Sequence, residues 1–291
     1  MKKVGIISDS NSGILQAEAK ALDIIVIPMP FTVDMEEFLE EISITQDEFY
    51  NHLENGASVS TSQPSGYYLE ELWDELLKDY DELVYIPMSS GLSKTCENAK
   101  AYAEKYNGKV FVVDNKRISV TLKESIFEAI ALRNDGKSAK EIKEYLEKTA
   151  DKNSIYITMG VSKYLKKGGR ISPAAAALGD MLKLKPILCS RGDSFEKFAM
   201  ALTVGQAKKK MMAQIKTELE NEFNSEYESG KMTVSVAHTA NQAEALKFKE
   251  EIIREFPLLK FRFVDPLSLS VSCHIGPGAL AVALSVDNFL E

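Results

Sequence analysis

The amino-acid sequence predicts an α/β protein whose mostly parallel sheet is covered by helices on both faces. Short apolar runs, including Val4–Ile7, Leu83–Met88 and Val110–Val113, are separated by stretches with helical periodicity. Strands that alternate with helices along the chain are typical of this architecture. Because both faces of such a sheet are buried, its strands are continuous apolar runs rather than alternating ones.

The length of the chain and a change of pattern predict two domains. A chain of 291 residues is long for a single domain. The regular alternation changes near residue 153. We therefore expect an N-terminal α/β domain over residues 1–152 and a C-terminal α/β domain over residues 153–291.

The first expected element is the buried strand Val4–Ile7, followed by the turn Ser8–Gly13. The glycine spacing of this turn does not fit a dinucleotide loop, and Gly13 stands where a calcium loop needs an oxygen ligand. Asp9 has two interpretations. It is either a nucleophile, as in aspartyl-phosphate enzymes, or a residue that stabilises the turn by accepting hydrogen bonds from backbone amides, which is the simpler interpretation.

The rest of the N-terminal half is marked by capping signals. A strand over residues 24–27 precedes the acidic segment 34–43, which we expect to be a surface excursion. Thr45–Glu48 and Ser138–Glu141 are capping boxes, so a helix is expected to follow each of them. A further helix is expected over residues 121–132.

The C-terminal half predicts strands, a hairpin and helices. Strands are expected over residues 154–159, 233–238 and 260–264, a hairpin over 185–202, and helices over 204–223 and 242–254. Ser172-Pro173 predicts another helix start, and Gly168-Gly169 lets the backbone bend sharply before Arg170. The cluster Lys208-Lys209-Lys210 is expected to lie on a solvated helix face.

Two hydroxyl-rich turns are the strongest candidates for a ligand site. Val59–Ser65 carries four hydroxyls just ahead of an amphipathic helix, and Ser89–Thr95 has the same character between a strand and a helix. In an open parallel sheet, ligands bind beyond the carboxyl ends of the strands. Two such turns in one sheet would place Thr61 and Ser93 along one edge.

A hydroxyl at a helix N-terminus has two interpretations. Backbone N–H groups are unpaired there and the helix dipole is positive, so the position suits an anion. Pro64 fits the first helical turn, where its missing N–H costs nothing. The simpler interpretation is that Thr61 or Ser62 only caps the helix.

Charge and cysteine content restrict the class of protein. A net charge of −8 without a long basic run argues against a nucleic-acid partner. Three cysteines, far apart and without metal-site spacing, indicate free thiols in a reducing compartment. No apolar run approaches the length of about 18 residues that a membrane span needs, and the N-terminus lacks a signal-peptide pattern. We expect a cytoplasmic protein.

Five motifs follow one another along the chain: Ser8-Asp9-Ser10, Ser60–Ser65, Ser89–Ser93, Gly168–Ser172 and His274–Ala279. In this order and spacing they resemble the DegV family of bacterial fatty-acid-binding proteins, and the resemblance covers essentially the whole chain. It implies an N-terminal three-layer α/β/α domain with a mostly parallel sheet and a C-terminal two-layer α/β domain with a mixed sheet.

The resemblance also implies a function. A long-chain fatty acid would lie in a tunnel between the two domains, with its carboxylate held by Thr61 and Ser93 and with Arg170 and His274 near the head group. Some family members present the acid to a separate ATP-dependent kinase related to dihydroxyacetone kinases, which forms an acyl phosphate. A transient membrane contact would fit this function, but no sequence feature indicates one.

The predicted ligand-binding residues are Thr61, Ser62, Ser90, Ser93, Arg170, His274 and Gly276. One departure from the family lies beside them, because members often have Gly-Thr-Tyr where this chain has Lys94-Thr95-Cys96. Lys94 either adds charge near the head group or points to solvent. Cys96 is smaller than tyrosine and would widen the tunnel.

The prediction is therefore a lipid carrier without a catalytic apparatus of its own. The sequence has no nucleophile beside a base, no paired carboxylates and no metal-ligand cluster, so no catalytic residue, metal or cofactor is predicted. The alternative is a phosphotransferase or acyl-transferring enzyme that uses Asp9 or Ser93, although no glycine loop for phosphate is present. A third interpretation is a sensor whose bound lipid changes a contact with a partner.

Overall fold

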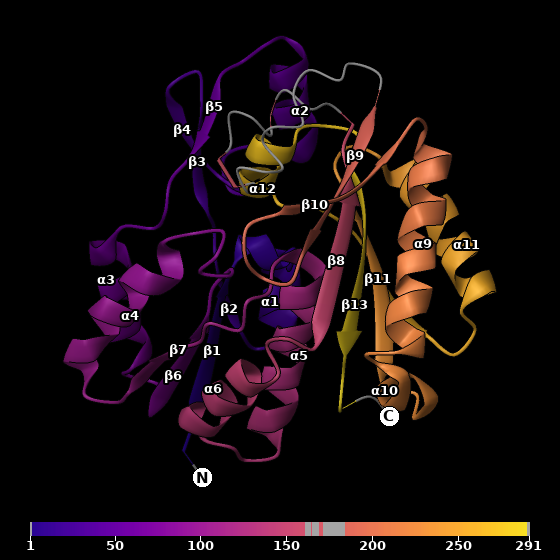
Figure 1. The fold of residues 1–291 in the computed structure, drawn as a ribbon. Coiled ribbons are helices and arrows are strands. Elements are labelled where there is room, and N and C mark those ends of the chain that lie inside the picture. The colour runs from indigo at the N-terminus through magenta and orange to yellow at the C-terminus, as the bar shows by residue number, and fades with distance from the viewer. Residues whose placement is uncertain (1, 161–163, 165–168, 171–183, 290–291) are drawn as a thin grey trace. The chain divides into compact units, whose positions relative to one another are not determined.

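The computed structural model describes residues 2–160, 164, 169–170 and 184–289. The chain forms two compact units (Figure 1). Unit 1 comprises Met1–Asp151 together with Ser268–Ser270, and unit 2 comprises Lys152–Leu267 with Val271–Glu291. Each unit is described by itself below. The functional roles expected for the two domains stay a prediction.

Unit 1 is built on a four-stranded parallel sheet in the order β2-β1-β6-β7. Its strands are β1 (Val4–Asp9), β2 (Ile25–Ile27), β6 (Glu82–Ile86) and β7 (Val110–Val112). Every residue of β1 and β6 is buried, which explains why these strands are unbroken apolar runs in the sequence.

Helices cover both faces of this sheet (Figure 1). The helices of unit 1 that pack around it are α1 (Gln16–Ala21), α3 (Gly66–Leu76), α4 (Thr95–Ala103), α5 (Ser119–Asn134) and α6 (Ala139–Lys148). On the α3 and α4 side, Trp73 and Ala99 pack against Tyr85 of β6 in one apolar cluster. α5 and α6 lie on the opposite side. The predicted α/β/α layering is confirmed.

The capping signals behave as expected. Thr45 and Glu48 form a capping box at the start of α2 (Gln46–Glu54), and Ser138 and Glu141 form one at the start of α6. In both, the hydroxyl accepts a bond from the backbone N–H three residues later while the carboxylate accepts one from the backbone N–H of the cap residue. Both helices therefore begin where the sequence predicts.

A second, antiparallel sheet in unit 1 was not foreseen. It has the order β4-β3-β5 and consists of β3 (Pro30–Val33), β4 (Glu36–Leu39) and β5 (Val59–Thr61). Most of residues 34–43 are exposed, as expected for a surface excursion, but the segment contains strand β4 rather than only a loop. Exposed Glu36 and Glu37 on β4 gave this segment the composition of a loop, whereas Glu40, directly after β4, is buried.

Unit 2 is built on a six-stranded mixed sheet in the order β10-β9-β8-β13-β11-β12. Its strands are β8 (Asn153–Thr158), β9 (Lys185–Ser190), β10 (Glu196–Ala201), β11 (Met232–His238), β12 (Lys260–Pro266) and β13 (Leu280–Val286). In the described part of the sheet β11 and β12 pair in parallel and the other pairs are antiparallel. β9 and β10 form the predicted hairpin.

The helices of unit 2 pack on this sheet or connect its strands. They are α9 (Val204–Glu220), α10 (Asn224–Glu228), α11 (Gln242–Glu255) and α12 (Leu269–Ile275), the last of which begins in the segment grouped with unit 1. Met211 of α9 and Phe248 of α11 join Val234 of β11 in the apolar core. The short helix α12 was not predicted.

The lysine cluster on α9 is only partly solvated. Lys208 was expected to face solvent with its neighbours, but it is 6% exposed and forms ion pairs of 2.6 Å with Glu244 and Glu251 of α11. The prediction is therefore wrong for Lys208, because a charged group can be buried where partners compensate it. Lys209 and Lys210 are exposed.

Candidate functional site

Thr61 is the last residue of β5 and lies in the small antiparallel sheet of unit 1. It is half-buried and stands opposite Phe31 of β3. Ser62 follows it, is exposed, and donates its backbone N–H to the carbonyl of Pro30 at 3.1 Å. Backbone pairing therefore continues one residue beyond the strand and holds Thr61 in an extended conformation.

The cap of α3 is Ser65. Its Oγ accepts a hydrogen bond from the backbone N–H of Tyr68 at 3.1 Å. The interpretation that Thr61 or Ser62 caps this helix is therefore wrong. Pro64 is also outside the first helical turn, because it precedes the cap residue and the helix begins at Gly66. The positive end of the α3 dipole therefore lies at Ser65, four residues beyond Thr61.

Ser93 lies at the start of α4, where a hydroxyl can either stabilise the helix start or bind an anion. Its Oγ accepts the backbone N–H of Thr95 at 3.2 Å and is 3.0 Å from the Oγ of Thr95. The side chain is half-buried. A hydroxyl at this position stabilises the helix start and lies where the dipole favours negative charge.

Ser90 has strong local partners. Its Oγ donates to Asp114 Oδ2 at 2.6 Å and accepts from Lys116 Nζ, while its backbone N–H donates to Asp114 Oδ1 at 3.2 Å. These bonds tie the turn after β6 to the loop after β7. The geometry therefore gives Ser90 a role in holding the Ser89–Ser93 turn, and its predicted ligand contact stays a prediction.

The two hydroxyl turns do not follow strands of one sheet, as the sequence had suggested. Thr61 ends a strand of the antiparallel sheet, whereas Ser93 follows β6 of the parallel sheet. One side-chain hydrogen bond links the segments that follow them, because Asn98 Nδ2 of α4 donates to Gln63 Oε1 at 3.0 Å. The loop after Thr61 thus lies against the helix that begins after Ser93.

The structure also locates the departure from the family pattern. Lys94 is exposed and pairs with Glu97 at 2.8 Å, so of the two alternatives it points to solvent. Cys96 is buried in the apolar cluster between α4 and the parallel sheet. Burial, which disfavours the thiolate, raises the pKa of Cys96 to about 12. Its predicted effect on tunnel width stays a prediction.

Arg170 and His274 lie close enough in unit 2 to interact. Burial and then the positive charge of Arg170 lower the pKa of His274 to about 4, so the imidazole is neutral at pH 7. Arg170 is exposed, and its carbonyl accepts the backbone N–H of Phe195 at 3.0 Å. The helix start predicted at Ser172-Pro173 lies outside the described residues.

His274 belongs to the last turn of α12 rather than to a tight turn alone. Gly276 follows it with φ +72° and donates its N–H to the carbonyl of Ser272 at 2.8 Å, which is a left-handed helix cap. A Cβ at Gly276 would stand 2.1 Å from the ring of Tyr164. Gly276 therefore fixes the end of the helix by its backbone.

A network that the sequence did not reveal supports this turn. Thr239, directly after β11, donates its hydroxyl to the carbonyl of Gly276 at 2.6 Å and accepts the N–H of Ala279 at 2.8 Å. Gly160 packs against the same loop, where an added Cβ would stand 2.2 Å from the carbonyl oxygen of Pro277. No local signal marks Thr239, because its partners are distant in sequence.

Asp9 has the contacts of the simpler interpretation. It is 0% exposed, and its carboxylate accepts backbone N–H groups of Asn11 at 3.0 Å and of Met88 at 3.1 Å. Burial raises its pKa to about 6, although these hydrogen bonds act in the opposite direction and lower it. A carboxylate enclosed in this way is poorly placed for attack on a substrate, which disfavours the enzyme alternative based on Asp9.

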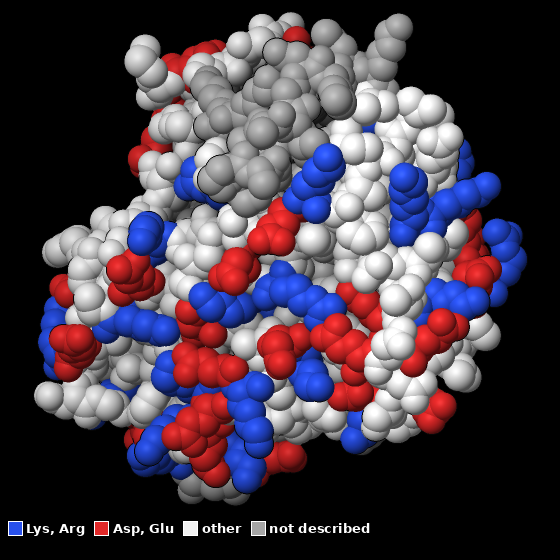
Figure 2. Space-filling view, viewed as in Figure 1, with Lys and Arg blue, Asp and Glu red and all other residues white. Residues whose placement is uncertain are grey.

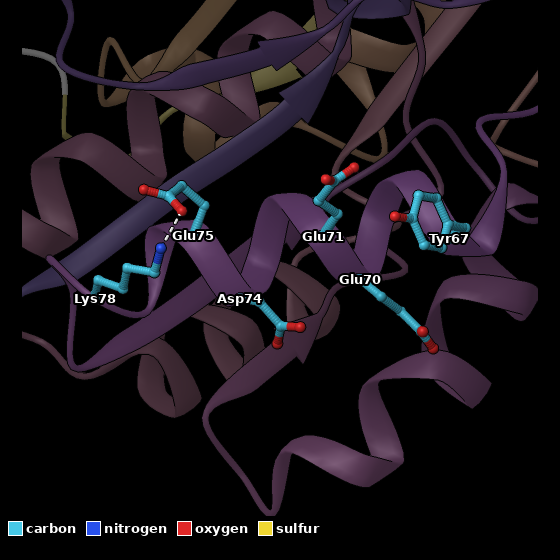
Figure 3. A pocket seen from close by; sticks show the side chains of 6 residues that line it. All are labelled: Tyr67, Glu70, Glu71, Asp74, Glu75 and Lys78. Atoms are coloured by element: carbon cyan, nitrogen blue, oxygen red, sulfur yellow. Dashed lines mark hydrogen bonds and ion pairs between the residues drawn. The ribbon is translucent and has the colours of Figure 1, made fainter.

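The pocket on α3 has the wrong charge for a carboxylate. It is lined by Tyr67, Glu70, Glu71, Asp74, Glu75 and Lys78 (Figure 3). Glu70 pairs with Lys105 at 2.6 Å, and Glu75 pairs with Lys78. On the face in Figure 2, basic and acidic side chains are interspersed rather than separated.

Within the ranges that the structure describes, His, Cys, Asp and Glu form no group of three suited to a metal ion. None of the helices in those ranges combines the length and the apolar character that a membrane crossing requires.

The fold and the site together define an α/β protein of two units with hydroxyl groups at the ends of neighbouring elements. A family model described as an uncharacterised protein, DegV family, matches residues 3–287. A DegV domain-containing protein of Staphylococcus aureus (strain N315) is 30% identical over 284 residues, which is 98% of this chain and 99% of that protein. The chain belongs to the DegV family.

Solved structures of relatives share the fold, which confirms the predicted pairing of a parallel sheet with a mixed sheet. The crystal structure of DegV, a fatty acid binding protein from Bacillus subtilis, matches with a TM-score of 0.85 and 25% identity, covering 99% of this chain and 100% of that one. A stearic acid-binding protein from Eubacterium ventriosum matches with a TM-score of 0.86 and 21% identity, covering 98% of each chain.

Proposed function

We propose that this protein binds a long-chain fatty acid whose carboxylate is held by the hydroxyls of Thr61 and Ser93. The observation that carries the proposal is the bond between Gln63 and Asn98, which sets the loop after Thr61 against the helix that begins after Ser93. The Bacillus subtilis relative, described as a fatty acid binding protein, supports the class of ligand.

The energetics suit such a ligand. Burying roughly 15 methylenes at about 0.8 kcal/mol each yields on the order of 12 kcal/mol before the costs of association. The tail therefore dominates affinity, and the hydroxyls determine which end is the head. We propose that residues 1–152 supply the carboxylate site and that residues 153–291 close the acyl tunnel.

The first test is to ask what the purified protein carries. Organic extraction followed by mass spectrometry, beside native mass spectrometry of the intact protein, should reveal a long-chain fatty acid. Protein that is empty and that also fails to take up added fatty acids would contradict the proposal.

The second test concerns the head group. Thr61→Ala and Ser93→Ala should each weaken fatty-acid binding by about 0.5–3 kcal/mol, the range that covers a hydrogen bond to a charged group or a lost donor. Ser60→Ala is the matched control, because side chains alternate along a strand and Ser60 Oγ instead bonds Thr32 Oγ1 at 2.8 Å. Unchanged affinity in the Thr61→Ala, Ser93→Ala double variant would leave both hydroxyls structural.

We propose further that the bound acid is presented to a separate ATP-dependent kinase, which forms an acyl phosphate. Two features support this step, because an acyl phosphate carries more negative charge than the acid: Arg170 is a cation, and the imidazole of His274 carries an N–H that can donate to the product. Arg170→Ala and His274→Ala should retain bound fatty acid but lose phosphorylation.

A binding assay run beside a kinase assay on the same variants separates the possible roles. Affinity should change by about 1 kcal/mol or less at each site, since tail burial supplies most of the binding free energy. Full phosphorylation in both variants would make Arg170 and His274 structural. Loss of binding in step with loss of phosphorylation would place them in the acid site instead.

A further inference from the structure

The turn after β1 is the centre of a buried polar network. Asp9 Oδ1 accepts both the backbone N–H of Asn11 at 3.0 Å and its side-chain Nδ2 at 2.9 Å. Asp9 Oδ2 accepts the backbone N–H of Met88 at 3.1 Å. Met88 directly precedes the Ser89–Ser93 turn, so the carboxylate of Asp9 joins the two turns.

Asn11 extends this network to the segment Ser268–Ser270, which belongs to unit 1. The side chain of Asn11 is 1% exposed. Its Nδ2 donates to Asp9, which leaves Oδ1 to accept the hydroxyls of Ser268 at 3.0 Å and Ser270 at 2.6 Å. Asp9 thus fixes the orientation of the amide that holds the segment.

Glu40, directly after β4, holds the same segment. It is 3% exposed, and Oε1 accepts the backbone N–H of Leu269, the first residue of α12. Oε2 accepts the hydroxyl of Ser10 at 2.7 Å, and Ser10 Oγ accepts the N–H of Met29 at 3.0 Å. One of the unpaired N–H groups at the start of a helix is thereby satisfied by a buried carboxyl.

Packing alone does not explain this arrangement. Burial raises the pKa of Glu40 to about 8 and that of Asp9 to about 6, and the charge of Asp9 contributes to the shift of Glu40. Buried charged groups often stabilise a fold less than apolar residues of the same size would. Their hydrogen bonds are directional, however, and directional bonds fix position.

We propose that Asp9, Asn11 and Glu40 are positioning residues that fix the start of α12 and, through this helix, the imidazole of His274. The proposal rests on the proposed function, in which His274 acts near the head group. His274 lies five residues after Leu269, about 7.5 Å along the helix axis. Because α12 is continuous from Leu269 to Ile275, we expect a shift at Leu269 to be transmitted to the ring.

The test compares two substitutions of Glu40 in the full-length protein. Glu40→Gln keeps an acceptor for Leu269 and gains an amide donor for Ser10 Oγ, whereas Glu40→Met has similar size and neither function. The measurements are the NMR signals and the pKa of the His274 imidazole, thermal stability, and the affinity for oleate. Ser60→Ala is again the control.

Glu40→Met should shift the His274 signals, raise the pKa of His274 towards its ordinary value, and weaken oleate binding by about fivefold or less, since loss of the ring itself is expected to cost no more. Glu40→Gln should resemble the wild type in all three. A folded Glu40→Met protein with unmoved His274 signals would overturn the proposal.

A second variant covers the case in which Glu40→Met does not fold. Ser268→Ala combined with Ser270→Ala removes two donors to Asn11 and leaves both carboxyls in place. It should shift the His274 signals in the same direction, and unmoved signals would overturn the proposal. The NMR readout needs no ligand. Wild-type protein that binds no fatty acid would therefore refute the proposed function, while the His274 signals of the variants would still test the positioning role.

Discussion

At the scale of single residues, His274 is the most informative side chain of the candidate site. Its pKa is lowered to about 4 by burial and by the positive charge of Arg170, so protonation costs free energy in the absence of an anion. A fatty-acid carboxylate bound beside the ring would favour the charged form. Under the proposed function, the pKa of this ring should therefore rise when the ligand binds.

We expect added oleate to raise the pKa of His274, as measured by NMR titration of the imidazole with and without ligand. His238 is the internal control, because its pKa is lowered by burial alone and it lies within β11. A His274 pKa that is the same in both titrations would show that the carboxylate binds elsewhere.

Glu40 predicts a pH dependence of stability. Its pKa is about 8 in the folded protein against 4.5 ordinarily, so between these values the folded state binds more protons than the unfolded state. The stabilisation is complete below pH 4.5 and is lost as the pH rises through about 8. The slope in this window is roughly 1.4 kcal/mol per pH unit for a single group.

Urea unfolding at pH 5, 7 and 9 measures this effect, with Glu40→Gln as the variant that cannot titrate. The free energy of unfolding of the wild type minus that of Glu40→Gln should decrease as the pH rises. A constant difference across this range would contradict the raised pKa.

The residue scale also shows what a sequence can reveal about a site. Thr61 and Ser93 stand out because hydroxyls cluster around them, and Arg170 and His274 follow from the family resemblance. Glu40 could not be found in this way, because it sits among Glu36, Glu37 and Glu41 in what looks like a solvated acidic segment. Its burial depends on partners that are distant in the sequence.

At the scale of elements, local signals predicted the starts of α2 and α6, missed the cap residue of α3, and did not reveal the sheet β4-β3-β5. The capping boxes at Thr45 and Ser138 are complete within four residues, so a sequence displays them in full. The sheet β4-β3-β5 depends on pairing between strands of three or four residues. Such short strands carry too little periodicity to be recognised.

The start of α3 gives a prediction at this scale. Ser65→Ala removes the hydroxyl that accepts from Tyr68 and should lower the free energy of unfolding by about 1 kcal/mol. Ser62→Ala, three residues earlier and exposed, should change it by less than about 0.5 kcal/mol. Chemical denaturation of the two variants tests this, and equal losses would contradict the assignment of Ser65 as the cap.

At the scale of the whole molecule, strand order is the property that could not be predicted from the sequence. The predicted alternation of strands and helices gave the parallel sheet of unit 1, but β13 reaches the middle of the sheet in unit 2, between β8 and β11. Neither capping nor hydrophobic periodicity specifies which strands become neighbours. This information resides in long-range packing.

The position of β13 predicts that the same Val→Ala substitution lowers the free energy of unfolding more on β13 than on the edge strand β12. Val282 on β13 is fully buried, so Val282→Ala should cost roughly 2 kcal/mol of unfolding free energy. Val264 on the edge strand β12 is half-buried, and Val264→Ala should cost distinctly less. Urea unfolding curves give both values, and a larger loss at Val264 would contradict the central role of β13.

The place of β13 also has a consequence for how the protein is made. Translation produces β8, β9 and β10 first, then β11 and β12, and it produces β13 after all of them. Until β13 emerges, the two groups of strands lack the strand that joins them, with β8 and β11 each exposing an unpaired edge. The sheet of unit 2 therefore cannot close during most of its own synthesis, and the nascent chain depends on its last strand for completion.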